Sequence, residues 1–140
     1  MAEKPFEIIE HTADVGVIVH GSTLEELFTN AASALFSVMV ELSDVNDRQE
    51  RKISVTARDW EGLLVNWLSE LLYYVDAEEL LFRRFQIQEL EPFHLRAQAF
   101  GEAIDRDRHR LHFGVKAITK HMLEVQEENG RWRAKVLFDI

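Results

Sequence analysis

The sequence predicts an α+β fold in which two amphipathic helices pack on one face of a largely antiparallel β-sheet. Two observations lead to this fold class. In the first half of the chain, apolar residues recur at helical spacing in two stretches. In the second half, apolar and polar residues alternate around turn signals, as they do in half-buried strands. Helices early and strands late are typical of a layered α+β domain.

Two short strands are expected before the first helix. Residues 6–10 and 15–20 are rich in Ile and Val, and a Gly-Ser-Thr sequence then ends the strand pattern. Either Ser22 or Thr23, together with the glutamate three residues later, fits a capping box that satisfies free backbone N–H groups. The helix that follows has one apolar stripe, formed by Leu24, Leu27, Phe28, Ala31, Leu35 and Met39.

The second helix also follows a strand. Ile53, Val55 and Ala57 alternate with polar residues, which predicts a half-buried strand. Asp59 can cap the helix that comes next. Its apolar stripe consists of Leu63, Leu64, Trp67, Leu68, Leu71 and Val75.

The two helical segments resemble each other weakly. A shift of 36 residues (66 minus 30) aligns Asn30 with Asn66 and Ser33 with Ser69, besides apolar positions. Two amphipathic helices share apolar spacing in any case, but the polar matches exceed that expectation. The sequence therefore leaves open an internal duplication of a strand–helix unit.

The rest of the chain reads as β structure. Strands are expected at 82–90 and 93–100, interrupted by a proline, and at 115–125 and 132–140. Asn129-Gly130 lies between the last two and is a strong hairpin-turn signal. Because there is no linker or low-complexity stretch, residues 1–140 are expected to form a single domain.

Composition excludes several classes of protein. There are no cysteines, so thiolate metal sites, disulfides and cysteine nucleophiles are excluded. Apolar runs are too short to span a membrane, and no apolar signal segment is present, which indicates a cytoplasmic protein. The net charge of −9, from 25 acidic and 16 basic residues, argues against a protein that grips nucleic acid alone. An acidic chain can still approach RNA indirectly, when it is bound to a basic partner protein.

Two acidic segments contain candidate metal ligands. His11, Thr12 and Asp14 gather in one short loop between strands, where a hard cation would favour the carboxylate oxygen of Asp14. An ordinary turn, in which Asp14 bonds nearby N–H groups, is the alternative. At the other end of the sequence, Asp139 lies beside the terminal carboxylate of Ile140, and two such anions repel unless a cation lies between them. Neighbouring basic residues of the same strand are the alternative source of positive charge.

Other polar residues of the C-terminal half are weaker candidates. Lys116 and Thr119 can bind a phosphate or a partner carboxylate, or they can be solvated residues of an edge strand. His109, with His112 and His121, has irregular spacing that does not favour a transition-metal cluster. No glycine-rich phosphate loop, HExxH or GxSxG motif is present.

Segments spread over nearly the whole chain together match a known pattern. They are HTADVG at 11–16, the helix that contains Glu26-Leu27-Phe28 and Ala31-Ala32, Leu64 with Trp67-Leu68 and Glu70-Leu71-Leu72, Gly101-Glu102, His109, VKAIT at 115–119 and Asp139-Ile140. In this order they resemble the archease family. Lys120 departs from the pattern, because an aromatic residue is expected there.

The resemblance implies a function. Archeases are accessory proteins, not enzymes, that promote guanylylation and repeated turnover of the GTP-dependent tRNA-splicing ligase. It also implies a divalent metal of the calcium type, held by Asp14, Asp139 and the carboxylate of Ile140. His11, Thr12, His109, Lys116 and Thr119 are further residues expected to support activation. The expected partner is the ligase, with RNA reached only through it and no membrane involved.

Two alternatives belong to other classes. One is a metal-dependent phosphoester hydrolase in which the same carboxylates hold the ion and His11 is the general base. The other is a chaperone-like binding protein, which would expose apolar patches.

Overall fold

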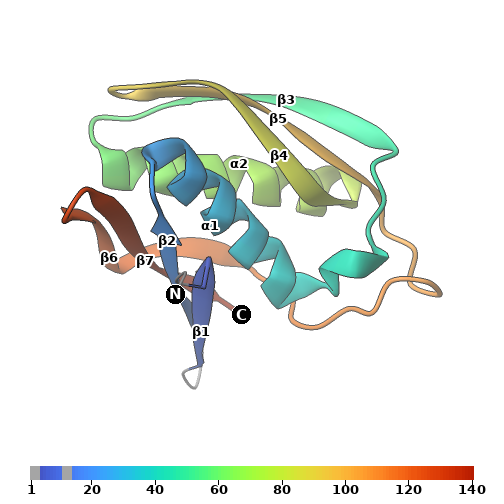
Figure 1. The fold of residues 1–140 in the computed structure, drawn as a ribbon. Helices are drawn as coiled ribbons and strands as arrows, with labels where there is room; N and C mark the ends of the chain where they lie inside the picture. The colour runs from blue at the N-terminus through green and yellow to red at the C-terminus, as the bar shows by residue number, and fades with distance from the viewer. Residues whose placement is uncertain (1–3, 11–13) are drawn as a thin grey trace.

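Two helices lie between two antiparallel sheets in the computed structural model (Figure 1). The structure describes residues 4–10 and 14–140. In chain order the elements of these residues are β1 (Phe6–Glu10), β2 (Asp14–Gly21), α1 (Leu24–Met39), a 3₁₀ turn (Leu42–Asp44), β3 (Gln49–Thr56), α2 (Trp60–Glu78), β4 (Leu80–Glu91), β5 (His94–Ala103), β6 (Ala117–Glu128) and β7 (Arg131–Asp139).

The strands of the described residues form a four-stranded sheet in the order β1-β2-β7-β6 and a three-stranded sheet in the order β3-β5-β4. Every pairing in both sheets is antiparallel. The first sheet therefore places β2, near the start of the chain, directly beside β7 at its end.

The α+β class with two helices and antiparallel strands is confirmed, but the strands form two sheets where one was expected. Helix α1 contacts β2 of one sheet and β4 of the other, and α2 contacts β6 and β3. The physical reason is that apolar residues extend beyond each predicted stripe: Ala32, Phe36 and Val38 of α1, and Val65 and Leu72 of α2, are also buried. A helix that is apolar on more than one side needs cover on more than one side.

The predicted helix starts and the predicted hairpin are confirmed. The Thr23 hydroxyl accepts a hydrogen bond from the Glu26 N–H at 3.1 Å, and the Asp59 carboxylate accepts one from the Gly62 N–H at 2.7 Å. Asn129 and Gly130 both have positive φ, 53° and 76°, as a two-residue hairpin turn between β6 and β7 requires.

The junction between strand and helix is built in the same way twice. The Asn30 side-chain amide donates to the His20 carbonyl at 2.7 Å, and the Asn66 amide donates to the Thr56 carbonyl at 2.8 Å. Each bond links a helix to the residue ten positions earlier, at or near the end of the preceding strand. The caps Thr23 and Asp59 are separated by the same 36 residues as the two asparagines (59 minus 23). These matches support the strand–helix repeat that the sequence indicates.

The core lies around the two helices. Trp67 of α2 is fully buried, and its indole N–H donates to the Phe28 carbonyl of α1 at 2.9 Å, which ties one helix to the other. The inner side of the β2–β7 pair is apolar and buried, and consists of Val15, Val17, Val19, Ala134, Val136 and Phe138. Among the described residues, no helix is both long and apolar enough to cross a membrane.

The hydrogen bonds of Asn30 and Asn66 differ in solvent exposure, and this difference tests their role at the two strand–helix junctions. Asn30→Ala should lower the free energy of unfolding by about 1 kcal/mol, because a partly buried hydrogen bond is lost. Asn66→Ala should cost less, because water can replace the lost bond at an exposed position. Urea unfolding of both variants measures the difference, and an equal loss for the two would contradict this account.

Candidate functional site

The register of the four-stranded sheet brings two acidic residues together. In the antiparallel pairing of β2 with β7, Asp14 lies directly opposite Asp139. Side chains of directly opposed residues point to the same face of a sheet, with Cβ atoms about 5 Å apart. The two carboxylates, which are 125 positions apart in sequence (139 minus 14), are therefore neighbours at one end of the sheet.

Strand alternation places both carboxylates on the face turned away from the helices. Val15 and Phe138, one residue further along each strand, are buried in the core. Successive strand residues point to opposite faces, so Asp14 and Asp139 point outward. Asp139 is exposed and Asp14 is half-buried.

One oxygen of Asp14 lacks a partner in the part of the chain that the structure describes. Its Oδ1 atom is buried and has no hydrogen-bond partner among the residues that the structure describes. A buried carboxylate oxygen that lacks a partner is costly. The simplest sources of compensation for two adjacent carboxylates are a bound cation or a donor from residues 11–13, which lie outside the described ranges.

Close packing at the next position fixes the strands. A Cβ atom added to Gly16 would lie 2.9 Å from Cδ2 of Leu137 and 3.4 Å from the Ile9 carbonyl oxygen. Any larger residue at position 16 would displace the Leu137 side chain, which covers β2 there. This contact keeps β1, β2 and β7 in place beside the acidic pair.

Lys116 and Thr119 approach the same end of the sheet from β6 and the segment before it. The Lys116 N–H donates to the Asp139 carbonyl at 2.7 Å, and Ala117 lies opposite Asp139 in the ladder. Thr119 lies opposite Leu137, and so on the same face as Asp139. Its hydroxyl accepts a hydrogen bond from the His121 N–H at 3.1 Å. Ile140 directly follows Asp139.

The donor set fits a hard cation. Calcium takes roughly six to eight oxygen ligands, commonly carboxylates, carbonyls and water. Asp14 and Asp139 offer carboxylate oxygens from adjacent strands, and the open side of Asp139 leaves room for water. Within the described residues, no three His, Cys, Asp or Glu side chains form a group that could hold a metal. Any further ligands would come from the main chain, from water or from outside the described ranges.

Of the other predicted residues, His11 and Thr12 lie outside the described ranges, and His109 lies elsewhere. The imidazole of His109 is fully buried beside Glu102, with 3.0 Å between Nε2 of His109 and Oε2 of Glu102. Nδ1 of His109 accepts a hydrogen bond from the Asp105 N–H at 2.9 Å. Because Nδ1 is an acceptor, the ring proton is on Nε2 and is donated to Glu102.

Glu102 is the centre of a buried charged network. Its side chain is only 5% exposed and accepts hydrogen bonds from Arg108 at 2.6 Å and from the Asn46 N–H at 2.8 Å, besides the bond from His109. Burial raises the pKa of Glu102, but the hydrogen bonds from Arg108, His109 and Asn46 outweigh it and lower the pKa to about 2. The carboxylate is therefore ionised and fully partnered.

A second pair fixes the same region. Arg110 binds Asp44 through two guanidinium contacts of 3.0 Å and its own N–H at 2.9 Å. These hydrogen bonds lower the pKa of Asp44 to about 2. Together, the Glu102 and Asp44 contacts hold residues 104–116, the segment between β5 and β6, which we call the strap.

Sequence reasoning singled out His109 but not the roles of Glu102 and Asp44. Glu102 lies next to Gly101 at the end of β5, and burial does not alternate there: Gly101 is packed against the backbone of β4, and Arg108 and His109 of the strap cover Glu102. Periodicity therefore gave no signal for a buried acid. The one available signal was that Gly101-Glu102 and His109 both occur in the family pattern.

The family model for the archease protein family (MTH1598/TM1083) matches residues 6–140. Among curated relatives, protein archease of Methanosarcina mazei is 39% identical, over 98% of this chain and 97% of its own length. Protein archease of Pyrococcus abyssi is 41% identical, over 98% of this chain and 99% of its own length.

Two solved structures share the fold. The solution structure of Methanobacterium thermoautotrophicum protein 1598 superposes with a TM-score of 0.81 and 39% identity, covering 97% of this chain and 99% of that one. A Thermotoga maritima protein, described as an archease and possible chaperone, superposes with a TM-score of 0.67 over 100% of this chain and 98% of its own, at 20% identity. At that identity it supports the fold alone.

The Glu102 network predicts a specific dependence on pH. The pKa of Glu102 is about 2 in the folded chain, against an ordinary value of 4.5. Its stabilisation is thus present above pH 4.5 and is lost as the pH falls toward 2. Glu102→Gln should lower the free energy of unfolding at neutral pH by about 2 kcal/mol and flatten this acid-side loss. Denaturant unfolding at several pH values measures this dependence, and Glu128→Gln on the exposed hairpin is the control. Identical profiles of unfolding free energy against pH for the wild type and Glu102→Gln would refute the prediction.

Proposed function

This chain belongs to the archease family, and from that premise we propose that it is an accessory protein of the GTP-dependent tRNA-splicing ligase. It promotes guanylylation of the ligase and its repeated turnover in the cytoplasm, and it binds a divalent cation, calcium by preference. The observation that supports this most directly is the outward-facing pair of Asp14 and Asp139, with one buried oxygen of Asp14 lacking a partner in the described residues.

The cation ligands proposed are Asp14, Asp139 and the main-chain carboxylate of Ile140. The first two approach from adjacent strands that the core holds in register. When bound, calcium supplies a fixed positive charge that can accept further oxygen ligands from a partner. The chain itself contributes a rigid frame, because β2 and β7 are paired along their lengths.

Lys116 and Thr119 are proposed to contact the ligase or its nucleotide. Lys116 is exposed, and its backbone N–H is bound to the Asp139 carbonyl, so its side chain extends from a main chain fixed beside the acidic end of the sheet. A lysine and a divalent cation at one surface can together attract phosphate oxygens or carboxylates. The net charge of −9 fits a protein that reaches RNA through its partner.

Calcium binding is tested on the protein alone. Asp14→Asn and Asp139→Asn should each weaken calcium affinity at least about tenfold, since each removes one charged ligand. Isothermal titration calorimetry measures the affinity, and calcium should raise the melting temperature of the wild type but less that of the variants. Asp107→Asn, an exposed aspartate of the strap, is the matched control. Unchanged affinity in both site variants would rule out this ligand set.

Ligase activation is tested with the cognate ligase and GTP. Adding the wild-type chain should increase the amount of guanylylated ligase and the number of RNA joining turnovers per ligase. Asp14→Asn and Asp139→Asn should lose most of this gain while their circular dichroism stays that of the wild type. If the wild type gives no gain, the proposed function is wrong. Turnover of a phosphoester panel by the chain alone would favour the hydrolase alternative.

A further inference from the structure

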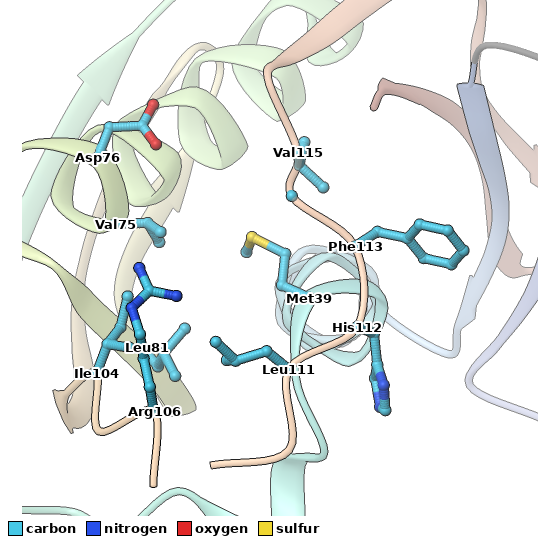
Figure 2. A pocket seen from close by; sticks show the side chains of 11 residues that line it. Met39, Val75, Asp76, Leu81, Ile104, Arg106, Leu111, His112, Phe113 and Val115 are labelled. Atoms are coloured by element: carbon cyan, nitrogen blue, oxygen red, sulfur yellow. The ribbon is translucent and has the colours of Figure 1, made fainter.

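An apolar hollow lies beside the strap and is lined by none of the residues of the acidic pair. It has a volume of about 290 Å³ and lies between the C-terminal ends of α1 and α2, the start of β4 and the strap. Figure 2 shows Leu111 and Arg106 directed into this space, with Phe113 and His112 directed away from it. The apolar part of its wall consists of Met39, Val75, Leu81, Ile104, Leu111 and Val115.

Backbone hydrogen bonds fix the strap beside this hollow. The N–H groups of His112 and Phe113 donate to the carbonyls of Met39 and Val38 at 2.8 and 3.1 Å, and the Arg110 carbonyl accepts from Glu41. The first two bonds satisfy carbonyls at the end of α1 that have no partner within the helix. The main chain at Leu111 therefore cannot shift without breaking these bonds at the end of α1, and the Leu111 side chain is 39% exposed.

Arg106 gives the hollow a charge preference. Among the residues the structure describes, its guanidinium has neither an ion-pair nor a hydrogen-bond partner, although the other arginines of the strap, Arg108 and Arg110, are both paired. An unpaired guanidinium beside an apolar wall favours a carboxylate ligand, which it can bind through two parallel hydrogen bonds. Asp76, on the opposite rim, is negatively charged, so it repels an anionic group and favours its placement beside Arg106.

We propose that this hollow binds an apolar side chain of the protein partner, and that Arg106 binds a carboxylate next to that side chain. The inference rests on the proposed function for the identity of the partner, the ligase, but the chemistry of the pocket follows from its own residues. The strap runs from this hollow to Lys116, whose N–H contacts Asp139, so a protein docked here would lie next to the acidic pair. The hollow would then hold the partner while the metal site faces it.

The pocket is tested first without the ligase. The probe is N-acetyl-L-phenylalanine, which has an apolar ring and a carboxylate, and its amide is the control without the charge. In ¹⁵N–¹H correlation spectra, the acid should shift the amide signals of Leu111, Phe113 and Gly114, and should bind about tenfold more tightly than the amide. Arg106→Gln should abolish the difference between the two probes. Arg58→Gln, at an exposed arginine just before α2, should behave as the wild type.

Several outcomes would overturn the pocket proposal. They are the absence of shifts at these amides, equal binding of acid and amide to the wild type, or unchanged discrimination in Arg106→Gln. Shifts at these amides that depend on the concentration of the free protein alone would show that a second copy of the chain fills the hollow, which also contradicts a partner side chain as its occupant.

The second arm uses the cognate ligase. Arg106→Glu and Leu111→Ser should weaken its binding about tenfold while calcium affinity stays unchanged. Tyr73→Ser, at an exposed tyrosine of α2, is the control for loss of surface apolar area. If both pocket variants bind the ligase as tightly as the wild type, docking at the hollow is wrong even though activation stands. If the wild type neither binds nor activates the ligase, the proposed function fails, and the probe titration still decides the chemistry of the pocket.

Discussion

The antiparallel pairing of β2 with β7 is the constraint on which the rest of the structure depends. It joins the first and last parts of the chain, and its inner face supplies buried valines, an alanine and Phe138 to the core around the helices. A slip of one residue would turn this whole apolar set to solvent. Hydrophobic burial therefore fixes the register, and the register in turn places Asp14 against Asp139. The acidic pair is held by the core, although neither carboxylate is part of it.

The carboxylates of Glu102 and Asp14 have opposite electrostatic surroundings. Glu102 is buried among Arg108, His109 and a backbone N–H, and these donors lower its pKa to about 2. Asp14 has a buried oxygen without a described partner and faces a second carboxylate. A compensated buried charge indicates a structural role, whereas a buried carboxylate oxygen without a partner among the described residues is where we propose a bound cation. Charge compensation thus separates the two clusters more clearly than residue type does.

The strap connects these features. It begins beside the Glu102 network, bonds to the end of α1 through His112 and Phe113, and ends at Lys116, whose N–H donates to Asp139. Between these points it forms one wall of the apolar hollow (Figure 2). This segment, which has no regular secondary structure, is thus held by ion pairs between side chains at one end and by backbone hydrogen bonds at the other. This explains how exposed apolar and basic groups can lie at defined positions between the helices and the acidic end of the sheet.

The sequence by itself determined the helix starts and the hairpin, because their signals are local: Thr23, one of two candidates, and Asp59 cap the helices, and Asn129-Gly130 forms the hairpin turn. It also aligned Asn30 with Asn66, which make equivalent bonds in the structure. It also identified Asp14 and Asp139 separately and, through the family pattern, as a pair. Only the tertiary structure decided that the strands form two sheets, that Asp14 lies opposite Asp139, and that His109 belongs to the Glu102 network. These features depend on strand partners and helix surfaces far apart in the chain, and periodicity reports which residues are apolar but not which element covers them.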